Sequence, residues 1–182
     1  MQIHSTEIED CYLIEPQVFK DDRGFFMESY SQKKFEKGTG LHISFVQDNI
    51  SQSSYGVIRG LHAQRGKSAQ AKLVSVIKGE VLDVVVDARK DSPTFKKVVA
   101  RKLDGVNKQQ LFVPKGCFHG FAVLSKDVTF FYKCDEFYDR DADYGIAHDD
   151  PEFDIDWLIP VEKRILSDKD KNLPLFNQII TK

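Results

Sequence analysis

Cysteine, tryptophan and long apolar runs are all scarce in this sequence of 182 residues. Cys11, Cys117 and Cys134 are odd in number and form no CxxC pair, which argues against a disulfide framework or a zinc knuckle and favours a reducing compartment. No segment approaches the roughly 18 apolar residues of a transmembrane helix. Glu7 and Glu9 lie where a secretion signal needs apolar residues. We therefore expect a cytoplasmic protein without a membrane partner.

An excess of charge of either sign is also missing. The chain has 26 lysines and arginines against 28 aspartates and glutamates, a formal charge of −2. No global positive field attracts nucleic acid, so a nucleic-acid partner is not expected and any anionic ligand needs a local group of basic residues. The length and the 41% of hydrophobic residues predict one folded domain over residues 1–182.

What the sequence does contain is a series of short strand-like runs rich in valine and phenylalanine. The clearest lies at 72–88, where two runs flank Lys78-Gly79 and predict a pair of strands joined by a turn. Further strands are expected at 98–103, 110–113, 118–124 and 128–134. Helices are expected only at 31–38, with a serine cap and a glycine stop, and at 173–180. This pattern predicts an all-β antiparallel sandwich or barrel.

One run places three polar residues between apolar partners: Arg59, His62 and Gln64, within residues 58–64. In a regular strand, Arg59 and His62 point to opposite faces. A bulge at Gly60 would turn them to the same face. The alternative is an edge strand with a solvated polar face, and the run alone does not decide between the two.

The spacing Pro114-x-Gly116-x-x-His119 resembles the second signature of the cupin superfamily. The positions of the first signature are held by three residues: His62, Gln64 and Lys72. A metal-binding cupin has three histidines and one glutamate there. A lysine in place of the carboxylate removes the anionic ligand and adds a repelling cation, so no metal is expected. The same groups suit proton transfer at an enolisable ligand.

Ten short segments follow one another in a characteristic order: residues 21–28, 45–49, 57–62, 70–74, 79–84, 92–95, 119–121, 132–133, 155–157 and 166–170. Together they resemble the dTDP-4-dehydrorhamnose 3,5-epimerase family over nearly the whole chain. The resemblance implies a cupin-type β-sandwich or jelly roll with a few short helices, a homodimer and a dTDP-4-keto-6-deoxy sugar as substrate. It also implies catalysis without a metal or an organic cofactor.

The reaction implied is inversion of dTDP-4-dehydro-6-deoxy-D-glucose at C3 and C5, in dTDP-rhamnose synthesis. A related 3-epimerase or ketoisomerase acting on another deoxysugar is the main alternative. A metal-dependent cupin oxygenase or isomerase is disfavoured by Gln64 and Lys72. A sugar-binding module without activity is disfavoured because both His62 and Tyr132 are kept.

Four catalytic roles follow from the resemblance. His62 is the general base, and Asp170 orients it and stabilises its charged form. Lys72 stabilises the enolate oxygen. Tyr132 delivers a proton from the opposite side, since a phenol donates without acting as a base at neutral pH. By composition alone, Asp168 is as good a candidate as Asp170, and Tyr132 could be a core residue.

Substrate contacts are implied in the same way. Arg23 and Arg59 match residues that hold the diphosphate and the sugar, a task suited to the paired donors of arginine. The alternative for Arg23 is a surface ion pair with Glu28, which would stabilise little. The remaining contacts implied are nucleotide-side Glu28, Gln47 and Asn49, the thymine-stacking Tyr138, the sugar-side His119, and Asp143 and Lys169 in irregular loops.

Overall fold

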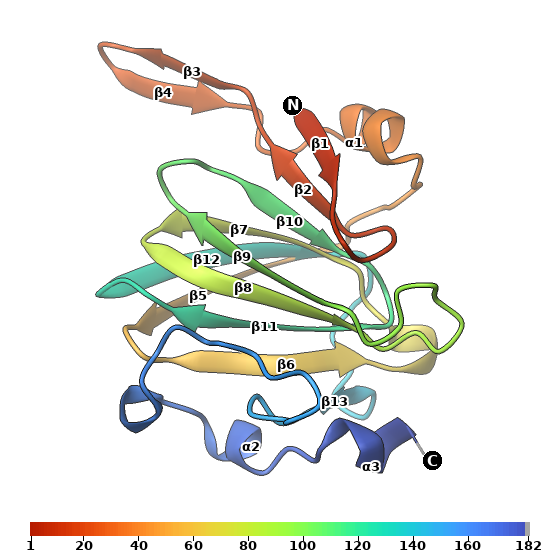
Figure 1. The fold of residues 1–182 in the computed structure, drawn as a ribbon. Coiled ribbons are helices and arrows are strands. Elements are labelled where there is room, and N and C mark those ends of the chain that lie inside the picture. Colours follow the sequence, from red (N-terminus) through yellow and green to blue (C-terminus); the bar gives the residue numbers. More distant parts are fainter. Residues whose placement is uncertain (181–182) are drawn as a thin grey trace.

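Two antiparallel sheets pack face to face and carry most of the regular structure (Figure 1). The structure is a computed structural model that describes residues 1–180. The six-stranded sheet has the order β1 (Gln2–Ser5), β2 (Tyr12–Glu15), β10 (Gln110–Val113), β7 (Lys72–Lys78), β12 (Asp127–Cys134) and β5 (Gln47–Ser54). The five-stranded sheet has the order β13 (Asp143–Gly145), β6 (Ile58–Gln64), β11 (Cys117–Val123), β8 (Glu80–Asp87) and β9 (Val98–Asp104). The expected all-β sandwich is confirmed.

The remaining elements cover or extend this sandwich. A hairpin of β3 (Val18–Asp21) and β4 (Gly24–Met27) projects away from the sheets (Figure 1). Helix α1 (Gln32–Thr39) packs near β1, whereas α2 (Asp168–Lys171) and α3 (Phe176–Ile180) lie in the C-terminal segment beside the five-stranded sheet. Two single 3₁₀ turns lie at Gly66–Ser68 and Val161–Lys163. Among the described residues, no helix is long and apolar enough to span a membrane.

The main core lies between the sheets and is built from alternate residues of facing strands. Val74 and Phe130 from the six-stranded sheet meet Val85 and Phe121 from the five-stranded sheet. A second cluster, on the other face of the five-stranded sheet, includes Trp157 of the C-terminal segment. Strand β8 is therefore covered on both sides, which explains its almost continuous run of buried residues.

The predicted strands at 72–88 exist, but the prediction that they pair with each other is wrong. β7 lies between β10 and β12, whereas β8 lies in the other sheet between β11 and β9. Only Gly79 separates β7 from β8, and the commonest hairpin loops have two residues. Gly79 has φ 87°, and a Cβ there would meet Asp127 O at 2.2 Å, so glycine alone allows the chain to turn between sheets here.

The two helix predictions are correct in place and wrong in length. α1 continues through Gly38 to Thr39 and ends at Gly40, which has φ 76°. Ser31 holds the N-cap position, but its side chain makes no capping hydrogen bond. The helix expected at 173–180 covers only Phe176–Ile180, after Pro174, which disfavours helical geometry in the residue before it.

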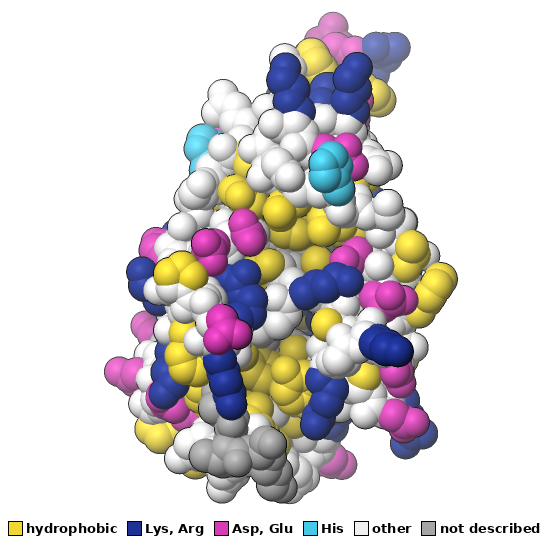
Figure 2. All heavy atoms as spheres, turned by 90° about the vertical axis from the view of Figure 1, so that its right-hand side faces the viewer, with side chains coloured by type: hydrophobic (Ala, Val, Ile, Leu, Met, Phe, Trp, Pro, Cys, Tyr) yellow, Lys and Arg dark blue, Asp and Glu magenta, His cyan; other side chains and the backbone are white. Residues whose placement is uncertain are grey.

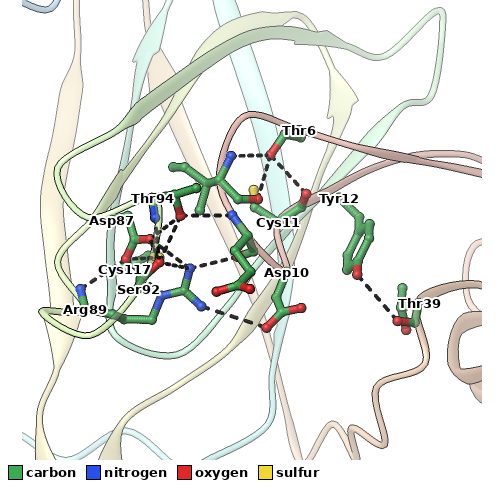
Figure 3. Close-up of polar contacts among 12 residues, drawn as sticks. Thr6, Asp10, Cys11, Tyr12, Thr39, Asp87, Arg89, Ser92, Thr94 and Cys117 are labelled. Atoms are coloured by element: carbon green, nitrogen blue, oxygen red, sulfur yellow. Dashed lines mark hydrogen bonds and ion pairs between the residues drawn. The ribbon is translucent and has the colours of Figure 1, made fainter.

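A buried ionic network fastens the N-terminal loop to the loop after β8 (Figure 3). The fully buried carboxylate of Asp87 accepts hydrogen bonds from Arg89 Nε at 2.8 Å and from the hydroxyls of Ser92 and Thr94 at 2.7 Å. Arg89 also donates to the carbonyl of Glu9 at 2.7 Å. Burial raises the pKa of Asp87, but these donors together outweigh burial and hold its pKa well below the usual range.

Replacing Asp87 by asparagine should therefore lower the free energy of unfolding at pH 7 by about 3–5 kcal/mol, because the charge of Arg89 loses its nearer carboxylate partner. A lowered native pKa stabilises the fold above the unfolded value near pH 4, and this stabilisation is lost as the pH falls below it. The difference in free energy of unfolding between wild type and Asp87→Asn should thus become smaller below about pH 4. Urea unfolding measures both effects, with the exposed Asp91→Asn as control. A gap that stays constant down to pH 2 would contradict the ionic account.

Candidate active site

A cavity of about 440 Å³ opens between the two sheets. Both sheets and the segment that leads into α2 supply its walls. The lining residues are Ser51, Val57, Arg59, His62, Lys72, His119, Gly120, Phe121, Phe130, Tyr132, Ile165, Ser167 and Asp170. We call it the inner cavity.

A second hollow of about 360 Å³ adjoins the first. Its lining residues are Gln47, Asn49, His62, Ala63, Gln64, Gln70, Lys72, Tyr132, Cys134, Tyr138 and Asp143. We call it the outer cavity. His62, Lys72 and Tyr132 line both cavities, so they lie where the two meet. An elongated ligand that fills both cavities passes these three side chains.

A bulge in β6 brings Arg59 and His62 to the same cavity. Opposite β11, His119 pairs with His62 and Phe121 pairs with Arg59, so three steps along β6 match two along β11. The extra residue lies at Gly60 or Leu61. A Cβ on Gly60 would lie 2.6 Å from His119 O, so glycine permits this close approach. The bulge hypothesis is confirmed, and the solvated edge strand is ruled out.

Lys72 and Tyr132 come from the facing sheet. β7 and β12 are neighbours, with Lys72 opposite Cys134 and Val74 opposite Tyr132. Because side chains alternate along a strand, Lys72 and Tyr132 share the inner face as diagonal neighbours. A ligand in the cavity therefore lies between His62 on one sheet and Lys72 with Tyr132 on the other.

His62 is held by the carboxylate of Asp170. Its Nε2 lies 2.5 Å from Asp170 Oδ1, and Asp170 is only 5% exposed. A hydrogen bond from Nε2 leaves Nδ1 as the nitrogen that can take a proton. The side chain of Asp168 is 97% exposed and pairs with Lys171 instead. Of the two aspartates, the structure places Asp170 at the histidine.

The helix that carries Asp170 is fixed beside β6 by backbone contacts. Ile165 N donates to Gly56 O at 2.9 Å, and Ile58 N donates to Ile165 O at 3.0 Å. Ser167 then begins α2 two residues further on. This short stretch of parallel pairing carries Asp170 to His62 across 108 positions of the sequence.

The electrostatics of the cavity favour a charged Asp170 and a neutral Tyr132. Burial raises the pKa of Asp170, but hydrogen bonds from His62 and Ser167 and the nearby charge outweigh it and leave the pKa below its ordinary value. Burial raises the pKa of Tyr132, so its phenol keeps its proton at neutral pH. Burial lowers the pKa of Lys72, which Cys134, Asp143 and Asp83 oppose.

A second histidine–aspartate pair lies beside the first. His119 Nε2 lies 2.9 Å and 3.1 Å from the two carboxylate oxygens of Asp83, and both residues are buried. His119 and His62 are cross-strand partners and line the inner cavity together. Asp83 was not expected as a site residue. Its alternation with Leu82 and Val84 along β8 predicts only that its side chain points to the opposite face of the sheet from theirs.

Four of the nine expected substrate contacts line the outer cavity. Gln47, Asn49, Tyr138 and Asp143 line it. The Tyr138 hydroxyl donates to Asp143 Oδ2 at 3.1 Å, and Gln47 Oε1 accepts from Tyr138 N at 3.0 Å. Lys169 pairs with Asp143 but does not line either cavity. Arg59 lines the inner cavity, where its Nε donates to Ser53 Oγ at 3.0 Å.

Arg23 and Glu28 line neither the inner nor the outer cavity. Arg23 is at the turn of the β3–β4 hairpin and pairs with Asp21. Glu28 follows β4 and pairs with Lys34 at 2.8 Å. The alternative of a surface ion pair between Arg23 and Glu28 does not form, since each pairs with another residue.

Several lining residues were not among the expected site residues, and three of these have hydroxyl or thiol groups: Ser51, Ser167 and Cys134. Cys134 follows from Tyr132 by strand alternation once β12 is recognised. Ser167 precedes Asp170 by three positions, a spacing typical of a helix N-cap. Ser51 lies in β5, whose polar sequence gives little sign of a strand.

The fold and the site together define a cupin-type β-sandwich with a cavity lined by His62, Asp170, Lys72 and Tyr132. Residues 5–178 match the sequence profile of the dTDP-4-dehydrorhamnose 3,5-epimerase family. The chain is 51% identical to the dTDP-4-dehydrorhamnose 3,5-epimerase of Shigella flexneri over 172 residues, 94% of each chain. This chain therefore belongs to the dTDP-4-dehydrorhamnose 3,5-epimerase family.

Solved structures agree with this assignment. The crystal structure of dTDP-4-dehydrorhamnose 3,5-epimerase from Elizabethkingia anophelis superposes with a TM-score of 0.95 at 52% identity and covers 98% of both chains. The dTDP-6-deoxy-D-glucose-3,5-epimerase of Legionella pneumophila, in complex with dTDP-4-keto-L-rhamnose, gives a TM-score of 0.94 at 46% identity, over 98% of this chain and 94% of that one. The cupin-type fold expected from the sequence is confirmed.

Replacing Gly60 by alanine should lower the free energy of unfolding by roughly 2–6 kcal/mol, since a strained φ of 109° adds to the clash with β11. Gly66→Ala is the matched control: Gly66 has φ 63°, but nothing lies within 4 Å of an added Cβ. The free energy of unfolding of that variant should fall by only about 1–2 kcal/mol. Urea unfolding compares the two. Equal losses would show that the close contact in β6 is unimportant.

Proposed function

We propose that this chain epimerises dTDP-4-dehydro-6-deoxy-D-glucose at C3 and C5 to dTDP-4-dehydro-L-rhamnose, a step of dTDP-rhamnose biosynthesis. Family membership supports the reaction. The observation that carries it in this structure is the placement of a histidine on one sheet and a tyrosine with a lysine on the other, around one cavity. Inversion of a carbon needs proton removal on one face and proton return on the other.

The ketone of the substrate makes inversion possible. Hydrogens on C3 and C5 are acidic because the negative charge left after their removal spreads to the C4 oxygen. His62 takes the proton, and the charge of Asp170 stabilises the imidazolium that forms. Tyr132 returns a proton from the facing sheet. Both enolates share the C4 oxygen, so one cation, Lys72, serves both inversions.

The two cavities suit the two parts of a nucleotide sugar. The inner cavity has Arg59 and His119 for polar groups of the sugar and the diphosphate. The outer cavity has the amides of Gln47 and Asn49 for base hydrogen bonds, and Tyr138 for stacking. Asp143 and Lys169 hold Tyr138 and α2 together at the rim of the outer cavity.

The chemistry requires no metal or organic cofactor. The C4 ketone itself takes up the negative charge, and the Lys72 ammonium offsets it. In a metal-binding cupin a carboxylate takes the position of Lys72, and a cation there opposes a divalent ion. We place the enzyme in the cytoplasm, which suits its three buried free thiols.

The active enzyme is a homodimer in this proposal. Phe19, Phe25 and Phe26 of the hairpin are 54%, 55% and 69% exposed, an apolar surface that a second copy would cover. Arg23 and Glu28 lie on or next to this hairpin. Docking of the hairpin on a second copy would bring them to the partner's cavity, where they would contact the nucleotide or the diphosphate.

His62→Ala should abolish solvent exchange at both C3 and C5 while the fold is kept. The reason is that His62 is the only base proposed for either carbon. Proton NMR of the 4-keto sugar nucleotide in deuterated water measures the exchange, and circular dichroism monitors the fold. The wild-type assay includes a strong chelator, which should leave the rate unchanged. Wild-type exchange in the variant would refute the mechanism.

Tyr132→Phe should separate exchange from inversion. The enolate still forms, but its protonation from the Tyr132 side is lost, so net epimerisation falls by roughly 10²–10⁴-fold. Exchange persists because His62 can return a solvent-derived proton to the original face. The same NMR assay resolves both. If exchange and inversion both stay near wild type, Tyr132 is only a packing residue.

Mixing two inactive variants tests the dimer. Arg23→Ala and His62→Ala chains are each expected to have little activity alone. In a mixed dimer, the cavity of the Arg23→Ala chain keeps its own His62 and receives Arg23 from its partner. Statistical mixing after co-refolding should restore about a quarter of the wild-type rate, because half of the dimers are mixed and each has one intact site. No recovery would contradict a shared site.

A further inference from the structure

Ser167 contacts the catalytic carboxylate on the side that His62 leaves free. Its hydroxyl donates to Asp170 Oδ2 at 2.8 Å, while Asp170 Oδ1 lies 2.5 Å from His62 Nε2. The same hydroxyl oxygen accepts a hydrogen bond from Asp170 N at 3.1 Å. Ser167 thus holds both the backbone and the side chain of Asp170.

The helix that carries Asp170 depends on this cap. α2 has four residues, far fewer than an isolated helix needs to be stable. Ser167 is its N-cap, and Ser167 O also accepts from Lys171 N at 3.1 Å. One hydroxyl therefore determines where the helix begins and where the carboxylate points.

Burial makes the second contact of the carboxylate important. Asp170 is 5% exposed, and a buried carboxylate oxygen without a donor is costly. If Oδ2 loses the hydroxyl, the carboxylate can rotate toward other donors and weaken its bond to His62. A catalytic base must be aligned closely, and small misplacements lower the rate markedly.

We propose that Ser167 is a positioning residue for epimerisation, which acts through Asp170 to hold His62 in the orientation that removes the proton. This rests on the proposed function. Ser167 lines the inner cavity, but its described hydrogen bonds go to Asp170 and Lys171 rather than to other lining residues. Its expected effect is therefore on kcat rather than on KM.

Three substitutions separate capping from positioning. Ser167→Thr keeps a hydroxyl and caps the helix. Ser167→Asp caps as well as serine does, but at neutral pH it cannot donate to Asp170 and repels it. Ser167→Ala does neither. The matched control is Asp168→Asn, a change at the exposed neighbouring position.

The experiment measures kcat and KM for inversion of the 4-keto sugar nucleotide, with melting temperatures for every variant. Ser167→Ala and Ser167→Asp should lose roughly 10–100-fold in kcat, because a small misplacement of a catalytic group can cost about 100-fold in rate. Ser167→Thr and Asp168→Asn should stay within about threefold of wild type. In an Asp170→Asn background, Ser167→Ala should add little, because residues that act through one another are not additive.

Three results would overturn the proposal. Full kcat in Ser167→Asp would show that the hydroxyl only caps the helix. A raised KM with unchanged kcat would show that Ser167 contacts the substrate instead. Additive losses in the double variant would show that it acts independently of Asp170.

Failure of the proposed function itself would be seen separately, as inactivity of the wild-type chain on the 4-keto sugar nucleotide. In that case a crystal structure of Ser167→Ala still tests the geometry. We expect the Asp170 carboxylate to turn away from His62. An unchanged contact between Asp170 and His62 would overturn the proposal without any activity assay.

Discussion

The hydrogen bond between His62 and Asp170 joins residues that lie 108 positions apart in the sequence, and several features of the fold bring them together. His62 reaches the cavity because β6 bulges beside Gly60. Asp170 reaches it because residue Ile165 pairs with the start of β6 and α2 begins directly afterwards. The apolar cluster around Trp157 and Phe176 holds the rest of the C-terminal segment on the same sheet. Loss of either attachment would leave the base without its carboxylate.

The sandwich architecture supplies the second requirement, which is a pair of opposed faces. A single strand or helix can present a base and an acid side by side, but inversion needs them on opposite sides of a ring. Two facing sheets meet this need with little further adaptation. Lys72 and Tyr132 are neighbours on one sheet because of strand alternation, and His62 with His119 are neighbours on the other. Of these four residues His119 is buried, which strengthens its interaction with Asp83.

Much of the fold follows from local patterns. The strands β9 to β12 fall where alternation and turn residues predict them, and the bulge at Gly60 was one of two open alternatives. Pairing is harder to predict, since the register of β7 and β8 depends on which sheet buries each strand. The hairpin β3–β4 and the polar strand β5 were not predicted as strands, because neither has an apolar alternation that local reasoning can use.

Some site residues could be predicted from the sequence, whereas others are recognised only in the tertiary structure. His62 and His119 follow from spacing that resembles the cupin signatures. Asp170 could not be separated from Asp168 by composition, because only the tertiary structure shows which one is buried at His62. Ser167 and Asp83 contact Asp170 and His119 by hydrogen bonds, and no short motif marks such partners. Arg23 and Glu28 line neither the inner nor the outer cavity, which only the tertiary structure shows.

The most direct measurement follows the substrate rather than the protein. The purified chain is incubated with dTDP-4-dehydro-6-deoxy-D-glucose in deuterated water, and proton NMR records which carbons exchange and which invert. We expect deuterium at both C3 and C5 and inversion of both centres. Inversion at C3 alone would restrict the enzyme to 3-epimerisation. Retention of both protons and both configurations would contradict the proposed catalytic roles of His62 and Tyr132.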